Sequence, residues 1–331
     1  MIYIRVDANK KIGMGHMMRC ISIAEALIIE GEKVCFLVAT EDAIDILEEK
    51  EYPYIVLNTD YQDMKSELPI LENILGKNEK ILIDSYQVTE TYFEELQKFG
   101  KVIYIDDVQK FSYPVDCIIN GNIYGDRIEY NVPLQLCGYK YALLKQEYVE
   151  AKKNRKPKNI LITTGGSDPY KITEKVIQCI QKDELLRKEQ YDVVCGRFSE
   201  SYETLCDIQK EYSNFHIHKD VKEMWKLMER AKIAITAGGS TMTELSCMGV
   251  PMVSFSFVDN QKKIIDTFYE RGYVHFGGHY EILGDEIYEV ICKKTKELVL
   301  NEKIRIDYSD KLTQLVDGQG CQRIAKHLIK L

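Results

Sequence analysis

The stretch Gly13-Met14-Gly15-His16-Met17-Met18-Arg19-Cys20 links a short apolar run, residues 2–6, to a run of helical periodicity, residues 20–27. The order of strand, glycine turn and helix is typical of an open α/β sheet, which binds ligands at the carboxyl ends of its strands. Such a turn brings backbone N–H groups to that edge. An imidazole there can accept a proton near neutral pH. The stretch predicts either a ligand site with a histidine base or a packing turn with an exposed histidine.

Short apolar runs and longer amphipathic runs alternate along the rest of the chain. In the first half, the runs that predict strands are residues 33–38, 54–57, 80–84, 102–107 and 117–120. Residues 151–158 form a basic, proline-containing break, which we interpret as a linker. The pattern then restarts, with predicted strands at residues 159–164, 191–195, 215–218, 233–236 and 251–255. This alternation predicts parallel sheets in two Rossmann-like domains, residues 1–150 and 158–318, followed by a C-terminal helix, residues 319–331.

Composition narrows the class of protein. The net charge of −8, from 52 acidic and 44 basic residues, disfavours nonspecific nucleic-acid binding. No apolar run approaches the roughly 20 residues of a membrane span, and the N-terminus does not resemble a signal peptide. The 10 cysteines are scattered without a C-x-x-C pair, which favours reduced thiols over a disulfide or zinc framework. We expect a cytoplasmic monomer that binds a small molecule and neither nucleic acid nor membrane.

The second predicted domain carries the clearer anion-binding pattern. Gly238-Gly239-Ser240-Thr241 stands between a predicted strand and a predicted helix. Glycines allow a phosphate to approach the backbone closely, the helix N-terminus favours negative charge, and the two hydroxyls add donors. Glu244 follows in the first helical turns. Its carboxylate can accept from a ribose diol, as in dinucleotide folds, or simply complement the helix dipole.

Two further segments are expected near the same site. Gly165-Gly166-Ser167-Asp168 repeats the glycine-rich turn after an earlier strand, although such turns are also common without a ligand. Asn260 and Gln261 follow the last predicted strand and either reach the ligand or form an exposed polar loop.

Other nucleotide and metal motifs are absent from the sequence. There is no G-x-G-x-x-G after a strand, no P-loop and no D-x-D pair. Asp106 and Asp107 are adjacent at a strand end, where they are expected to orient a loop or the substrate. His216 and His218 have a spacing that suits a metal, but no matching ligand set is present. We therefore expect neither a metal nor a cofactor.

Together these segments resemble a known family. The shared motifs are Arg5-Val6-Asp7, the G-x-G-H-x-x-R-C block, Asp84-Ser85-Tyr86, Ile105-Asp106-Asp107, residues 136–144, Gly165 to Pro169, Ala237 to Thr241, Glu244, Asn260-Gln261 and Val316-Asp317-Gly318-Gln319-Gly320. The chain resembles the UDP-2,4-diacetamido-2,4,6-trideoxy-β-L-altropyranose hydrolases of pseudaminic acid biosynthesis and the similar spore-coat polysaccharide proteins. The C-terminal motifs alone also resemble MurG-type glycosyltransferases. Lys145 and Tyr148 stand where the family usually has arginine and phenylalanine, outside the proposed chemistry, and Cys137 replaces the more usual leucine.

The resemblance implies a GT-B fold, with two Rossmann-like domains facing across a cleft, and it implies roles for particular residues. His16 would activate water, while Tyr86 and Asn260 would place the sugar and that water. Ser240 and Thr241 would meet the diphosphate, and Glu244 the ribose. The remaining expected substrate-binding residues are Asp7, Gly13, Gly15, Arg19, Gly165, Gly166, Ser167, Gly239 and Gln261. The last helix is expected to cross back onto the first domain.

The function implied is inverting hydrolysis of a UDP-linked sugar. Water would attack the anomeric carbon, and His16 would remove its proton. UDP is a good leaving group, so paired carboxylates like those of glycosidases are not required. The alternatives are a glycosyltransferase with an acceptor other than water, a hydrolysing UDP-sugar 2-epimerase, and a noncatalytic nucleotide-sugar sensor.

Overall fold

The computed structural model describes residues 1–9, 12–76, 79–166, 168–196 and 199–331. Ser167, expected in the anion site, lies outside the described residues. The chain divides into two compact units: unit 1 comprises residues 1–145 and 319–331, and unit 2 comprises residues 146–318. The C-terminal helix is thus part of unit 1.

The basic segment expected to be a linker is attached to unit 2. Its first two residues belong to helix α5 (Gln146–Lys152). Beyond the helix, the backbone N–H groups of Lys156 and Lys158 donate to the carbonyl oxygens of Glu229 and Arg230. These hydrogen bonds hold the segment against unit 2, and the boundary falls at Lys145 instead of residue 150.

Unit 1 is a parallel sheet of seven strands in the order β3-β2-β1-β4-β5-β6-β7. The strands are β1 (Ile2–Val6), β2 (Val34–Val38), β3 (Tyr54–Val56), β4 (Glu79–Asp84), β5 (Gly100–Ile105), β6 (Cys117–Asn120) and β7 (Leu134–Cys137). The helices are α1 (Gly15–Ile29), α2 (Ile44–Glu49), α3 (Leu68–Ile74), α4 (Glu90–Leu96) and α14 (Gly320–Lys330), with 3-10 helices at Glu41–Ala43, Met64–Glu67, Gly125–Arg127 and Tyr139–Tyr141. The sequence patterns predicted all of these strands except β7.

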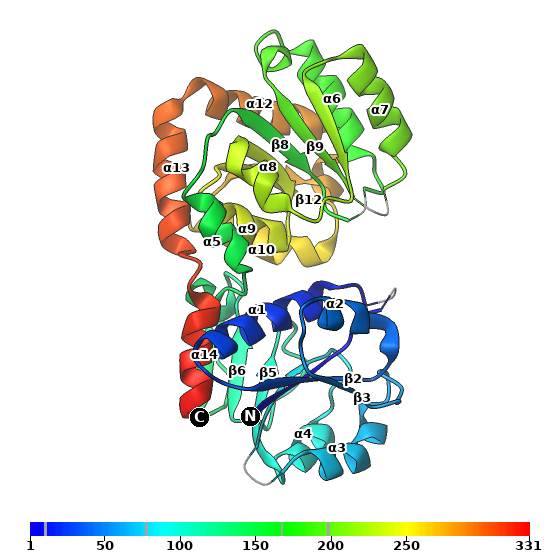
Figure 1. Cartoon of the computed structure of the whole chain (residues 1–331). Helices are drawn as coiled ribbons and strands as arrows, with labels where there is room; N and C mark the ends of the chain where they lie inside the picture. The colour runs from blue at the N-terminus through cyan, green and yellow to red at the C-terminus, as the bar shows by residue number, and fades with distance from the viewer. Residues whose placement is uncertain (10–11, 77–78, 167, 197–198) are drawn as a thin grey trace. The chain divides into compact units, whose positions relative to one another are not determined.

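Alternating side chains of unit 1 are buried on opposite faces of its sheet, as strand geometry requires. Ile2 and Ile4 of β1 join a core with α1, α2 and α14. Tyr3 of the same strand lies in a second core with α3 and α4. Helix α14 packs along α1, beside the N-terminal strand, as Figure 1 shows. The C-terminal helix α14 therefore packs against the N-terminal part of unit 1.

Unit 2 is a second parallel sheet, with six strands in the order β10-β9-β8-β11-β12-β13. Its strands are β8 (Asn159–Thr163), β9 (Tyr191–Cys195), β10 (Phe215–Lys219), β11 (Ala231–Ala237), β12 (Met252–Ser256) and β13 (His275–His279). Besides α5, its helices are α6 (Ile172–Lys182), α7 (Tyr202–Glu211), α8 (Met224–Arg230), α9 (Ser240–Met248), α10 (Asp259–Glu270), α11 (Tyr280–Leu283), α12 (Ile287–Leu300) and α13 (Glu302–Leu315), with 3-10 helices at Leu186–Lys188 and Gly284–Glu286.

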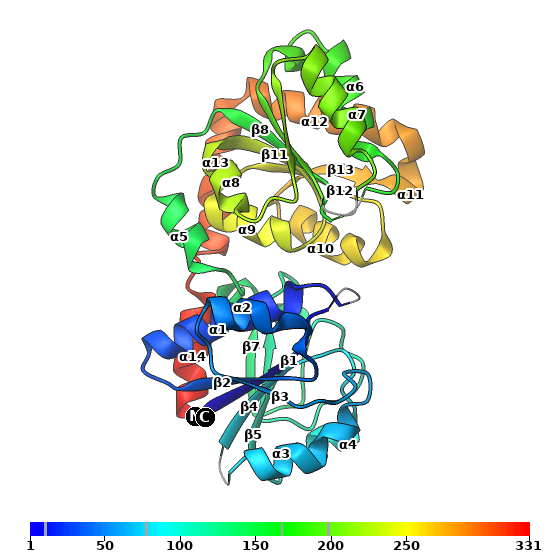
Figure 2. The ribbon, with the colours of Figure 1, turned by 45° about the vertical axis from the view of Figure 1, so that its right-hand side comes forward.

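The sheet of unit 2 is also covered on both faces. Ile160 and Ile162 of β8 share a core with α6, α7 and α12. Helices α8, α9 and α10 lie on the other face (Figure 2). Among the described residues, no helix combines the length and apolar character needed to cross a bilayer.

Candidate functional site

In unit 1 the strand order reverses between β1 and β4, which are neighbours in the sheet although other elements separate them in the chain. Such a reversal leaves a crevice at the carboxyl ends of the two strands, where open α/β sheets bind ligands. The segment after β1 leads into α1 and carries His16, and the segment after β4 carries Tyr86. Helix α1 begins at Gly15, five residues earlier than its predicted start, so His16 and Arg19 lie in its first turns and on one face.

His16 and Asp84 form a closely hydrogen-bonded pair. Nδ1 of His16 lies 2.5 Å from Oδ1 of Asp84, and the two side chains are 11% and 0% exposed. Because a carboxylate can only accept, we assign the proton of the neutral imidazole to Nδ1. This tautomer leaves the lone pair on Nε2, which has no hydrogen-bond partner in the described chain. Asp84 thus fixes the orientation of the imidazole, in the manner of the aspartate of a catalytic triad.

Arg19 is bound to both acidic side chains of the cluster. Its Nε and Nη2 atoms donate to Asp84 at 2.5 and 2.6 Å, and its Nη1 atom donates to Asp107 at 2.5 Å. Burial disfavours the charged form of Asp84, but Arg19 and His16 outweigh it and hold the pKa of this carboxyl below its usual value. Asp84 therefore remains ionised at neutral pH. Arg19, expected to bind substrate, holds the two carboxylates in place.

Tyr86 and Asp107 complete the cluster. The ring of Tyr86 packs edge-on against the His16 imidazole, with centroids 4.6 Å apart, and its hydroxyl donates to Asp107 at 3.0 Å. Burial and the neighbouring Asp107 raise the pKa of Tyr86, so the phenol stays protonated. Asn122 donates to the other oxygen of Asp107 at 3.0 Å. The cluster combines one unpaired imidazole nitrogen with fixed polar groups at the edge of the sheet.

Asp7 does not join this cluster. One carboxylate oxygen accepts from Nη1 of Arg5 at 2.6 Å, and the other accepts from the backbone N–H of Ala39 at 2.8 Å. The expected binding residue is therefore committed to a buried ion pair. Gly13 has a φ of +78°, a conformation that favours glycine, and closes the loop by donating to the carbonyl oxygen of Asn9.

In unit 2 the strand order reverses between β8 and β11. The two glycine-rich turns follow these two strands, so the structure brings the ends of both segments to one crevice. Gly165 has a φ of +93°, and a Cβ at Gly196 would come within 2.2 Å of its carbonyl oxygen. This turn does not enter a helix directly, because α6 begins only at Ile172, where Asp168 accepts from the first backbone N–H groups.

The second turn leads straight into α9, which begins at Ser240. A Cβ at Gly238 would lie 2.9 Å from Cβ of Gln261, so glycine is required for the approach of α10. Gln261 itself accepts from the backbone N–H of Phe257 at 3.0 Å, which fixes the start of α10. Gly239, Ser240 and Thr241 stand where the unpaired N–H groups of α9 are available to an anion.

Glu244 already has a partner within the protein. The buried Tyr148 of α5 donates a hydrogen bond to the Glu244 carboxylate, and burial together with that carboxylate raises the pKa of Tyr148. Tyr148, expected to lie outside the proposed chemistry, thus contacts the residue expected to bind ribose. A phenylalanine there would leave the carboxylate without this donor.

Asn260 is exposed at the start of α10, and its side chain makes no hydrogen bond within the described chain. Behind it, His279 joins β12 and β13 to α10: Nδ1 lies 2.6 Å from Oγ of Ser256, and Nε2 lies 3.0 Å from Asp266. No sequence pattern indicated this hydrogen-bond chain, which supports the helix that presents Asn260.

No group of three or more metal-ligating side chains is assembled among the described residues. His218, one of the two histidines with metal-like spacing, lies 2.8 Å from Asp192. That contact lies within the sheet and has the geometry of an ion pair. The expectation that the protein needs no metal stays a prediction.

Asp84 is the residue of this cluster to which the sequence patterns gave no role, and Asp107 was expected only to orient a loop or the substrate. Asp84 ends β4 and Asp107 follows β5. The available signal was their position, because carboxylates at the carboxyl ends of adjacent parallel strands share one edge of the sheet. If the pairing of β4 with β1 had been known, Asp84 would have been expected to lie close to His16.

Comparison with solved structures gives the class: the chain has two Rossmann-like halves of the GT-B type. MurG of Acinetobacter baumannii has a TM-score of 0.70 at 15% identity, covering 100% of this chain and 99% of that chain. UGT71G1 of Medicago truncatula, solved with UDP-glucose, has a TM-score of 0.68 at 11% identity, covering 99% and 98%. At these identities the likeness establishes the fold.

Sequence comparison gives one match to a domain family and two related proteins. Residues 159–305 match the glycosyltransferase family 28 C-terminal domain. The spore coat polysaccharide biosynthesis protein SpsG of Bacillus subtilis is 27% identical over 340 residues, covering 97% of this chain and 95% of that protein. The uncharacterized protein MJ1062 of Methanocaldococcus jannaschii is 29% identical over 293 residues. That alignment covers 82% of this chain but only 58% of the archaeal protein.

Proposed function

We propose that the protein hydrolyses a UDP-linked 2,4-diacetamido-2,4,6-trideoxy sugar to the free sugar and UDP, without a metal, in nonulosonic (pseudaminic) acid biosynthesis. The observation that carries the proposal is the hydrogen bond between His16 and Asp84, which leaves Nε2 of the imidazole as a base. The relation to a spore coat polysaccharide biosynthesis protein and the match to a glycosyltransferase domain support a nucleotide-sugar substrate.

In the proposed reaction, His16 acts at the anomeric carbon. Nε2 accepts a proton from water as the water oxygen bonds to that carbon, and the bond from carbon to the UDP oxygen breaks with inversion. The electron pair leaves with UDP. Asp84 stabilises the imidazolium that forms, and Tyr86, held by Asp107, positions the sugar beside it.

Unit 2 holds the nucleotide in this proposal. The backbone N–H groups at the start of α9 and the hydroxyls of Ser240 and Thr241 would bind the diphosphate and stabilise its growing charge. Glu244 would accept from the ribose, and the exposed amide of Asn260 would help to place the sugar and the water.

Transfer to an acceptor other than water is the second candidate, because the matched domain is a glycosyltransferase domain. Incubating the purified protein with the UDP-sugar alone separates the two. Release of free sugar and UDP supports hydrolysis, whereas no turnover until an acceptor is added supports transfer. A parallel incubation with UDP-N-acetylglucosamine detects a hydrolysing 2-epimerase, because that activity would yield the epimerised sugar.

The ribose assignment predicts a selective loss of affinity. Glu244→Ala should weaken UDP binding by about tenfold, the scale of one charge-assisted hydrogen bond, but should weaken binding of a diphosphate without ribose much less. Titration calorimetry with both ligands measures the difference. Tyr148→Phe is the matched control, because it removes the phenol that contacts Glu244 and keeps the carboxylate. Equal affinity for UDP in Glu244→Ala and the unaltered protein would remove the ribose role.

The proposed reaction is expected to need no metal ion. Activity on the UDP-sugar should be unchanged in excess EDTA, because a base and N–H donors replace a metal ion in the proposed step. Rates measured before and after chelation, and after adding magnesium or manganese, test this. Loss in EDTA with recovery on adding either ion would contradict the proposal.

A further inference from the structure

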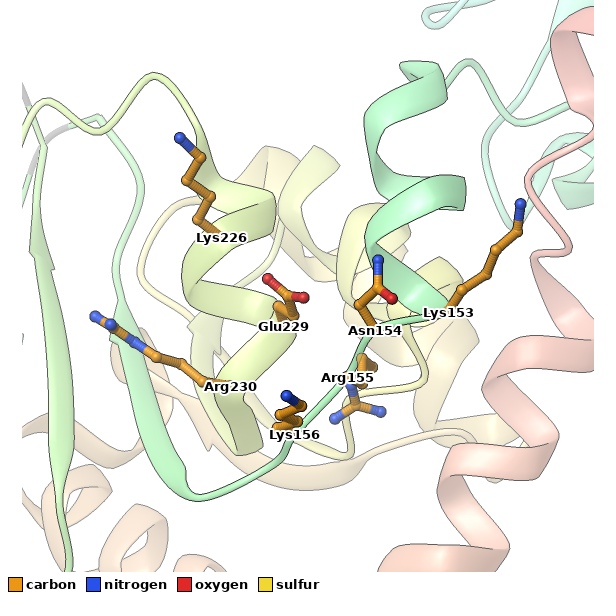
Figure 3. A pocket seen from close by; sticks show the side chains of 7 residues that line it. All are labelled: Lys153, Asn154, Arg155, Lys156, Lys226, Glu229 and Arg230. Atoms are coloured by element: carbon orange, nitrogen blue, oxygen red, sulfur yellow. The ribbon is translucent and has the colours of Figure 1, made fainter.

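Unit 2 contains a basic cavity at the amino ends of its central strands. Its volume is about 610 Å³. Figure 3 shows its lining, which comes from helix α8 and from the segment between α5 and β8: Lys153, Asn154, Arg155, Lys156, Lys226, Glu229 and Arg230. Five of these seven side chains are cationic and one is acidic. A composition of this kind is suited to a ligand of opposite charge.

Arg155 is the most constrained cation of this cavity. Its Nη1 and Nη2 atoms donate to the carbonyl oxygens of Gly249 and Ala231, at 2.7 and 2.6 Å. Its Nε atom is buried without a hydrogen-bond partner among the described residues. Burial with no carboxylate beside it lowers the pKa of Arg155 to about 10, which still leaves it charged at neutral pH. The fold therefore holds a partly desolvated positive charge that the protein does not neutralise.

The remaining charges leave a positive surplus. Arg230 is neutralised by the buried Asp192, 2.6 Å away. Lys153 and Lys226 each form a solvent-exposed ion pair with the glutamate three residues earlier. Another anion can easily replace these glutamates as the partner of the lysine. Lys156 has no acidic partner in the part of the chain that the structure describes. Together with Arg155, it supplies two uncompensated charges opposed within the cavity only by Glu229.

This cavity is separate from the proposed nucleotide site. Its residues precede β8 and β11, whereas the glycine-rich turns follow the same two strands. Strands of five and seven residues set the two places roughly 16–23 Å apart along the sheet. A ligand at one end cannot touch the side chains at the other.

We propose that this cavity binds a compact anion carrying at least two phosphate groups, at a second site independent of the proposed reaction. The flexible Lys156 and Lys226 suit phosphate oxygens, which accept from ammonium donors, and the fixed Arg155 adds its uncompensated charge beside them. The volume accommodates such an ion together with bound water.

Inorganic pyrophosphate is the probe, and the fluorescence of Trp225, the chain's one tryptophan, is the readout. Nζ of Lys226 lies 5.1 Å from the centre of the Trp225 ring, so a ligand that recruits this ammonium changes the ring's surroundings. Titration in saturating UDP should still give a saturable change. Calorimetry under the same conditions should give the same dissociation constant.

Three single variants make the test specific. Lys156→Glu should weaken pyrophosphate binding by roughly tenfold or more, and Glu229→Gln should strengthen it severalfold. Lys158→Glu is the matched control, because it makes the same change of charge at an exposed lysine that is two residues away and does not line the cavity; its affinity should stay within about twofold of the unaltered protein. All three changes lie on the surface or the rim, and circular dichroism checks that each variant is folded.

Two results would overturn the proposal. One is the absence of saturable pyrophosphate binding in saturating UDP, which would mean that the cavity has no affinity of its own. The other is equal weakening by Lys156→Glu and Lys158→Glu, or no effect of Glu229→Gln, which would mean that pyrophosphate senses only overall charge. Neither result bears on hydrolysis of the UDP-sugar, which is assayed separately.

Discussion

His16→Asn is expected to lower kcat on the UDP-sugar by on the order of 10²–10⁴, the usual contribution of a general base, and to leave the affinity for UDP unchanged. Asparagine suits this test because its amide can still donate to Asp84, as Nδ1 of the imidazole does. It has no counterpart of Nε2, so only the proton acceptor is lost. Steady-state rates and titration calorimetry with UDP measure the two quantities.

The bond that breaks is tested by running the reaction in ¹⁸O-water. Label in the sugar supports attack at the anomeric carbon, whereas label in UDP means attack at phosphorus and refutes the mechanism.

A lower melting temperature of His16→Asn with an unchanged kcat would show that the histidine only packs the start of α1. Because the base must be neutral, the rate of the unaltered enzyme should fall as the solution becomes acidic.

Asp84→Asn is expected to reduce kcat by on the order of 10²–10⁴, because an amide no longer fixes the tautomer with the lone pair on Nε2. The matched control is Asp107→Asn, which also removes a carboxylate from Arg19 but does not touch His16. Both variants should lose stability, since each leaves Arg19 less compensated. A much larger fall in kcat for Asp84→Asn supports the positioning role, and equal falls would assign the effect to Arg19 or to Tyr86, which Asp107 also holds.

The same variant changes the pH dependence of stability. The pKa of Asp84 is lower in the folded protein than the usual value near 3.9. A depressed folded-state pKa contributes stability that is fully present above the unfolded value and is lost as the pH falls through the folded one. The difference in unfolding free energy between the unaltered protein and Asp84→Asn should therefore shrink below about pH 4. Denaturant melts at several pH values measure this difference.

Local patterns in the sequence predicted most of the strands and the glycine turns that follow β1, β8 and β11. Those features depend on short-range periodicity and on backbone conformations that only glycine adopts easily, as Gly13 and Gly165 do. Strands β7 and β13 were not predicted. The first has four residues, and the second contains two adjacent glycines, so neither presents a long apolar run.

The sequence by itself determined that His16 lies beside a glycine turn that follows the first strand, and that two such turns follow strands in unit 2. Only the tertiary structure decided which side chains meet there. His16 and Asp84 are 68 positions apart, and Arg19 and Asp107 are 88 apart, so no local period connects them. Their contact follows from the strand order, which sets β4 beside β1 and β5 beside β4. The partner of the imidazole is thus a property of the sheet, because parallel strands bring their carboxyl ends to one edge regardless of their distance along the chain.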